Sequence, residues 1–81
     1  MRGKRTLHSS EQRRFVATLE AVRTKKEITQ VELAAIMGKP QSFVSKCLSG
    51  ERRVDFVEWL WFCEALDITP EAFLRRMRSI S

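Results

Sequence analysis

The sequence predicts an all-α fold, a compact domain of five helices. Apolar residues recur at intervals of three and four in several segments, for example Phe15, Leu19 and Val22, and this is the helical period. No segment alternates apolar and polar residues for long enough to form a strand, and β-branched residues are scattered. A chain of 81 residues can bury one modest core, so we expect a single domain over residues 9–81.

The segment before the first helix, residues 1–8, has no apolar periodicity and is interpreted as a flexible basic arm. The first helix begins at Ser9 or Ser10, whose hydroxyl can cap it, and runs to about Lys25. No apolar stretch follows the charged N-terminus, and no apolar run approaches the roughly 18 residues that a membrane span requires. We therefore expect a cytoplasmic protein with neither a secretory signal nor a membrane partner.

A helix-turn-helix unit is predicted for the second and third helices. Thr29 and Glu32 form a capping box at the start of the second helix, which Gly38 ends with a left-handed turn. Pro40 then fixes the start of the third helix, residues 41–49. A turn of this kind between two short helices can hold the third helix clear of the core, so that one polar face of that helix is free.

The fourth helix, residues 55–66, and the fifth, which opens at Pro70, complete the fold. The fourth helix carries more apolar bulk than one buried face requires, with Trp61 and Phe62 pointing in different directions. Because exposed aromatic patches typically mark protein interfaces, we expect self-association through Trp61, with Phe62 and the fifth helix beside it. The alternative is that the arm or the C-terminal helix covers the patch.

The polar face of the third helix has the chemistry of base-edge recognition. Glutamine can form paired hydrogen bonds with adenine, serine can serve several bases, and lysine can reach a guanine edge or a phosphate. A phenylalanine here can touch a thymine methyl group or pack on a neighbouring helix. The candidate side chains are Gln41, Ser42, Phe43, Ser45 and Lys46, and the alternative is an ordinary solvated surface.

The net charge of +5 is concentrated in the first third of the chain. Residues 1–27 contain eight Lys or Arg and three Glu, whereas residues 28–50 carry a net +1 and residues 51–81 a net −1. A basic excess in a small domain favours polyanionic partners, usually nucleic acid.

Three short motifs between residues 28 and 53 point to one family of DNA-binding proteins. They are Ile28-Thr29-Gln30 with Glu32-Leu33-Ala34, then Gly38-Lys39-Pro40-Gln41-Ser42 with Val44-Ser45-Lys46, and finally Ser49-Gly50-Glu51-Arg52-Arg53. With them, residues 10–77 resemble the lambda-repressor/Cro family, also called the xenobiotic-response-element family of helix-turn-helix proteins. The resemblance implies a five-helix domain that binds double-stranded operator DNA as a dimer, with helix 41–49 as the reader in the major groove.

The resemblance also assigns DNA contacts to individual residues. The implied set is Gln41, Ser42 and Phe43 for bases, Ser45 and Lys46 for bases or phosphate, and Gln30, Lys39, Ser49, Arg52 and Arg53 for the DNA backbone. Gln30 is also implied to support Gln41. Three residues depart from the family pattern. Lys39 stands where an apolar residue is common, Leu48 where a polar residue is frequent, which suggests deeper packing there, and Trp61 where a charged residue is common.

These features predict a sequence-specific DNA-binding transcriptional regulator, a repressor that occludes its operator as a homodimer with half-sites about 34 Å apart. The alternative is a protein-interaction module, such as the antitoxin of a toxin–antitoxin pair, that binds its partner with the aromatic helix 55–66. An enzyme is disfavoured because the sequence has no clustered acid–base pair, no nucleophile beside a histidine and no glycine-rich phosphate loop. Cys47 and Cys63, with 15 residues between them, fit buried core thiols rather than a metal site, and no cofactor is expected.

Overall fold

The computed structural model describes residues 9–79, which form five α-helices and no strand. The helices are α1 (Ser10–Lys25), α2 (Gln30–Met37), α3 (Gln41–Leu48), α4 (Phe56–Ala65) and α5 (Pro70–Ser79). The all-α prediction is confirmed, and α3 and α4 are slightly shorter than predicted because Ser49, Asp55 and Leu66 are caps just outside them. None of these described helices has the length and apolar composition needed to cross a bilayer. The basic arm predicted for residues 1–8 lies outside the described residues.

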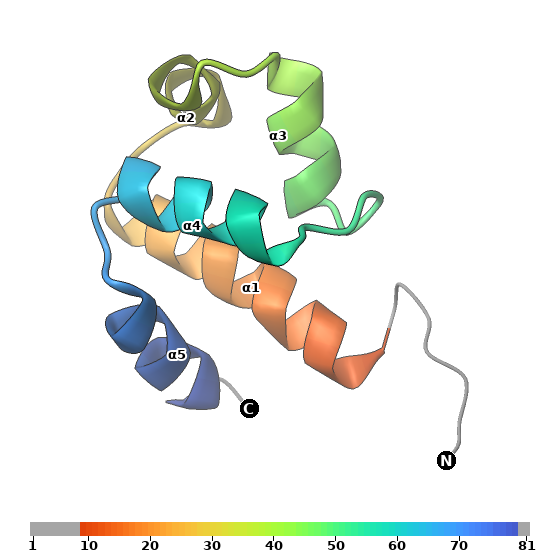
Figure 1. Ribbon diagram of the computed structural model, residues 1–81, viewed down its shortest axis with the longest axis vertical. Coiled ribbons are helices and arrows are strands. Elements are labelled where there is room, and N and C mark those ends of the chain that lie inside the picture. Colours follow the sequence, from red (N-terminus) through yellow and green to blue (C-terminus); the bar gives the residue numbers. More distant parts are fainter. Residues whose placement is uncertain (1–8, 80–81) are drawn as a thin grey trace.

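The helix-turn-helix unit stands at one end of the molecule. Figure 1 shows α2 and α3 at this end and α5 at the other, with α1 and α4 between them. Helix α1 packs on both α3 and α5, and α4 packs on both α2 and α5. Helices α1 and α4 therefore connect the two ends of the domain and support the helix-turn-helix unit.

One contiguous core draws side chains from all five helices. Its fully or almost fully buried members include Leu19 and Val22 of α1, Leu33 of α2, Val44 and Cys47 of α3, Phe62 and Cys63 of α4, and Phe73 of α5. Burial of each large apolar side chain contributes about 1.5–3 kcal/mol relative to exposure. In a domain this small, the inward face of each helix is set by this one core.

The prediction that Phe62 takes part in a protein interface is wrong. Its side chain is fully buried in the core, and its ring stacks on Phe43 of α3 with the ring centroids 6.3 Å apart. Trp61, the next residue toward the N-terminus, is 38% exposed. Consecutive helical residues point about 100° apart, and here Phe62 faces the core whereas Trp61 lies at its edge.

Side-chain caps define where four of the five helices begin. Ser9, Thr29, Asp55 and Thr69 each accept a hydrogen bond from the backbone N–H three residues later. In α2 and α4 the third residue is glutamate and returns a bond to the cap's own N–H, which completes a capping box and confirms the one predicted at Thr29. Each such cap contributes about 1 kcal/mol to helix stability.

Two phenylalanines of α4 provide a matched test of this core. We expect Phe62→Ala to lower the free energy of unfolding by about 3–5 kcal/mol, because it opens a cavity among side chains that cannot fully collapse. Phe56→Ala is the control, since Phe56 is 68% exposed, and it should change stability by about 1 kcal/mol or less. Urea unfolding followed by circular dichroism measures both. Equal losses in the two variants would contradict the assignment of Phe62 to the core.

Candidate nucleic-acid interface

The turn between α2 and α3 depends on Gly38. Its φ is +68°, its N–H donates to the Ala35 carbonyl at 3.2 Å, and the N–H of Lys39 donates to Ala34 O at 3.0 Å. A Cβ at this position would meet no atom within 4 Å, so the constraint is the left-handed backbone conformation rather than space. That conformation costs about 1–2 kcal/mol for a residue that carries a side chain. The turn lets α3 leave at a steep angle to α2, as Figure 1 shows.

Helix α3 has one buried face and one exposed polar face. Val44 and Cys47 are fully buried and Leu48 is 5% exposed. The opposite face carries the exposed side chains of Gln41, Ser42, Ser45 and Lys46, which were predicted to read DNA. Within residues 9–79, these four side chains take part in no hydrogen bond or ion pair. Their donors and acceptors are therefore open to a ligand.

The first turn of α3 lacks the side-chain cap that the other four helices have. Its cap residue is Pro40, whose carbonyl accepts from Phe43 N–H at 3.0 Å but which has no side-chain acceptor. The backbone N–H groups of Gln41 and Ser42, like the first N–H groups of any helix, have no acceptor among the described residues. No acidic residue lies in this turn either. Free amides at the positive end of a helix dipole favour an anion such as phosphate.

Gln30, at the start of α2, is bonded to α1 and not to Gln41. Its side-chain amide donates to Glu20 Oε2 at 3.4 Å. Glu20 also accepts from the guanidinium of Arg23 at 2.6 and 3.1 Å, and Arg23 donates to the Ile28 carbonyl at 2.7 Å. This network joins the end of α1 to the start of α2. It orients Gln30 at the edge of the helix-turn-helix unit.

Lys39 and Phe43 contact α4 rather than open solvent. The Lys39 ammonium lies 4.4 Å from the centroid of the Trp61 ring, which is cation–π distance. Phe43 is half-buried, with Phe62 on one side and the Arg52 guanidinium 4.8 Å from its ring centroid. Of the two alternatives stated for Phe43, packing on a neighbouring helix is the one that the structure shows.

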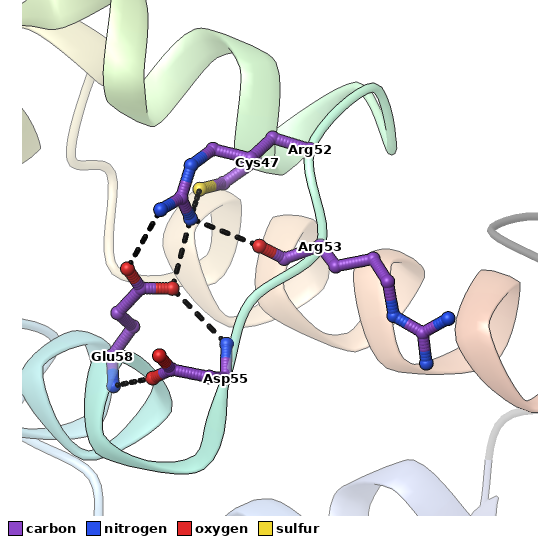
Figure 2. Close-up of polar contacts among 5 residues, drawn as sticks. All are labelled: Cys47, Arg52, Arg53, Asp55 and Glu58. Atoms are coloured by element: carbon purple, nitrogen blue, oxygen red, sulfur yellow. Dashed lines mark hydrogen bonds and ion pairs between the residues drawn. The ribbon is translucent and has the colours of Figure 1, made fainter.

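Arg52 and Arg53 have different surroundings (Figure 2). Arg52 donates to both carboxylate oxygens of Glu58, at 2.8 and 2.9 Å, and to the carbonyl of Arg53 at 2.9 Å. Glu58 also accepts from Asp55 N–H at 3.0 Å as part of the α4 capping box. The Arg53 side chain extends away from this cluster and forms no ion pair within the described residues. Arg52 therefore fixes the loop between α3 and α4, and Arg53 is the cation left available.

Ser49 likewise has a local role. Its hydroxyl donates to Lys46 O at 3.1 Å and accepts from Glu51 N–H at 3.3 Å. Gly50 follows with a φ of +83°, which turns the chain away from the end of α3. These contacts hold the loop that carries Arg53.

The two cysteines are buried free thiols, as predicted. Burial raises the pKa of Cys47, although the neighbouring Arg52 opposes the shift, and burial raises the pKa of Cys63 to about 11. Both thiols are therefore protonated at neutral pH, the form that neither attacks an electrophile nor binds a metal.

The ion pair between Arg52 and Glu58 was not predicted from the sequence. The Asp55 and Glu58 spacing is a visible capping-box signal. The arginine, however, lies six residues before the glutamate and meets it across a loop whose path the sequence does not specify.

The Arg52–Glu58 pair should make stability depend on pH. Hydrogen bonds from Arg52 and Asp55 lower the pKa of Glu58 in the folded state. The stabilisation is thus fully present above the unfolded-state pKa of about 4.3 and is lost as pH falls through the folded-state pKa. We expect Glu58→Gln to lower the free energy of unfolding at pH 7 by about 1 kcal/mol, with the difference from wild type shrinking below about pH 4.

Glu51→Gln is the control for this substitution, since Glu51 is an exposed acid in the same loop with no side-chain bond among the described residues. It should leave the unfolding free energy unchanged across the same pH series. A Glu58→Gln difference that is constant from pH 7 to pH 2, or absent, would contradict the role of the pair.

The matches to known proteins agree with this geometry. Residues 19–73 match the profile of a helix-turn-helix family. A solved structure of an XRE-family-like protein from Pseudomonas syringae pv. tomato str. DC3000 superposes with a TM-score of 0.80 and 37% sequence identity, covering 93% of this chain and 94% of that one. Among curated protein sequences, none matches this chain. The chain therefore belongs to the XRE family of helix-turn-helix proteins and is, at the family level, a DNA-binding regulator.

Proposed function

We propose that this protein is a sequence-specific transcriptional repressor that inserts α3 into the major groove and occludes its operator. The observation that carries the proposal is the exposed polar face of α3, whose four side chains have no partner within the described residues. A major groove about 12 Å wide admits one such helix, and each base pair presents a distinct pattern of donors and acceptors there. Gln41 and Ser42 lie at the N-terminal end of the helix, the end that typically reaches base edges.

The surrounding residues are suited to the phosphate backbone. Free amides at the start of α3 and the guanidinium of Arg53 can each take a phosphate oxygen. Lys46, on the exposed face, supplies a further positive charge. Arg52 and Phe43 support the DNA-binding surface indirectly. Arg52 holds the loop between α3 and α4 in place, and Phe43 holds the inner side of α3.

A dimer is the assembly that fits this mode of binding. Two reader helices placed one turn of DNA apart lie about 34 Å from each other. The longest dimension of the molecule is 39 Å, so two copies on one face of the duplex would be close enough to touch. Binding of both copies blocks access of other proteins to the operator, which is repression by occlusion.

Gln41 is the most direct test of base reading. After selection of bound sequences from random duplexes, we expect Gln41→Ala to weaken binding to the selected operator by about 1–3 kcal/mol and to relax the preference at one base pair. Binding to unrelated duplex should not change, because that binding depends on phosphate contacts. Fluorescence anisotropy at fixed salt measures both affinities.

Thr24→Ala is the control, because Thr24 is an exposed residue of α1 distant in sequence from α3. It should bind like wild type. Selection that enriches no sequence, or a Gln41→Ala variant with full operator affinity and unchanged preference, would contradict the reader role of α3.

A further inference from the structure

Two basic residues that flank α3, Lys39 and Arg52, are both held by α4. Lys39 lies in the turn before α3, and its ammonium is 4.4 Å from the centroid of the Trp61 ring. Arg52 lies in the loop after α3 and donates to both carboxylate oxygens of Glu58. Trp61 and Glu58 are three positions apart on α4, so they lie on the same side of that helix. One side of α4 therefore binds a cation from each end of α3.

The surroundings of the Lys39 ammonium favour its remaining on α4. A second aromatic ring, that of Phe43, has its centroid 5.8 Å from the ammonium, within the range of cation–π attraction. Glu64 lines the same hollow as Lys39 and Trp61, and the charge of Lys39 contributes to lowering the pKa of Glu58. Moving the ammonium to a DNA phosphate would end the contacts with both rings and take the charge away from these carboxylates.

Without the Trp61 ring, the same ammonium would be close to the DNA-binding face. Lys39 is two residues before Gln41, in the turn that leads into α3. Lysine has a flexible four-carbon stem and binds phosphate as a point charge, so it needs no fixed geometry. Each phosphate that a lysine neutralises releases counterions, which raises the affinity for duplex DNA of any sequence.

We propose that Trp61 keeps Lys39 away from the phosphate backbone, so that the ammonium remains over the indole ring when the chain binds DNA. The chain then binds duplex of any sequence more weakly, and with less dependence on salt, than the positive charge around α3 would give. Weak binding to unrelated DNA leaves more of a repressor free to occupy its operator. This inference rests on the proposed function only in that the start of α3 faces the duplex.

The test is the salt dependence of binding to a mixed-sequence duplex that lacks the selected operator. Trp61→Leu removes the aromatic face but keeps apolar bulk. We expect it to tighten binding by about fivefold at ~0.1 M salt, and to steepen the slope of log K against log salt by about 0.9 per chain. Trp61→Phe should stay closer to wild type, because a phenyl ring also attracts the ammonium. Fluorescence anisotropy over a salt series measures affinity and slope.

Lys39→Gln shows whether the effect of Trp61 depends on this ammonium. In the wild-type background it should leave the slope unchanged, because Lys39 contacts no phosphate there. Combined with Trp61→Leu, it should abolish the gain in affinity and in slope. Phe56→Leu is the control, since Phe56 is an exposed aromatic residue of α4 whose ring contacts Trp59 rather than Lys39. It should bind like wild type.

Nuclear magnetic resonance gives a readout that a general loss of packing would not produce. The ε-methylene group of Lys39 is bonded to the ammonium that lies over the Trp61 ring, so the ring current should shift its proton signals upfield. We expect this shift in the free chain and in the DNA complex, and its loss in Trp61→Leu. Circular dichroism first establishes that every variant is folded. Lys39→Gln and the wild-type spectra test the proposal even if Trp61→Leu does not fold.

Three results would overturn the proposal. They are a lower slope for Lys39→Gln in the wild-type background, a Lys39 signal that loses its upfield shift when DNA binds, and a Trp61→Leu chain with the affinity and slope of wild type. If any of these is found while Gln41→Ala still weakens operator binding, the proposed function stands without this inference. If the Trp61 and Lys39 results hold but Gln41→Ala has no effect, the inference stands and base reading by Gln41 fails.

Discussion

The direction in which α3 presents its polar side chains is set by the burial of its other face. A helix of eight residues is too short to be stable alone in water, so its existence and its direction come from tertiary packing. Val44, Cys47 and Leu48 provide that packing against the core. Because these three residues are buried, the polar side of the helix faces outward. The exposed polar face of α3, which we propose reads DNA, is thus a consequence of the core.

The basic residues around α3 divide into those that build the site and those that remain available. Arg52 is bound by Glu58 and stacked on Phe43, and Lys39 lies over Trp61. These contacts join α3 and its flanking turns to α4. A cation held in this way would bind phosphate with a smaller gain in free energy, because binding DNA would require it to leave its partner. Charge alone therefore does not identify which residues meet the DNA.

The features that could be predicted from the sequence are those determined by near neighbours. The capping box at Thr29 and the left-handed turn at Gly38 involve residues within a few positions of each other, and both are present. The orientation of α4 could not be predicted in this way. Helical periodicity shows that Trp61 and Phe62 point in different directions, but it does not show which of them faces the core. The position of Phe43 depends in the same way on Phe62, a residue of another helix. Contacts between helices are what a single sequence reveals least.

Nuclear magnetic resonance can show whether the outer face of α3 is the surface that meets DNA. The backbone amide signals of the isotope-labelled protein would be recorded while the duplex selected from random sequences is added. We expect the largest shifts at residues 41–46, with smaller shifts at the start of α2 and at Arg53. Shifts concentrated on the solvent side of α5, with residues 41–46 unchanged, would contradict it.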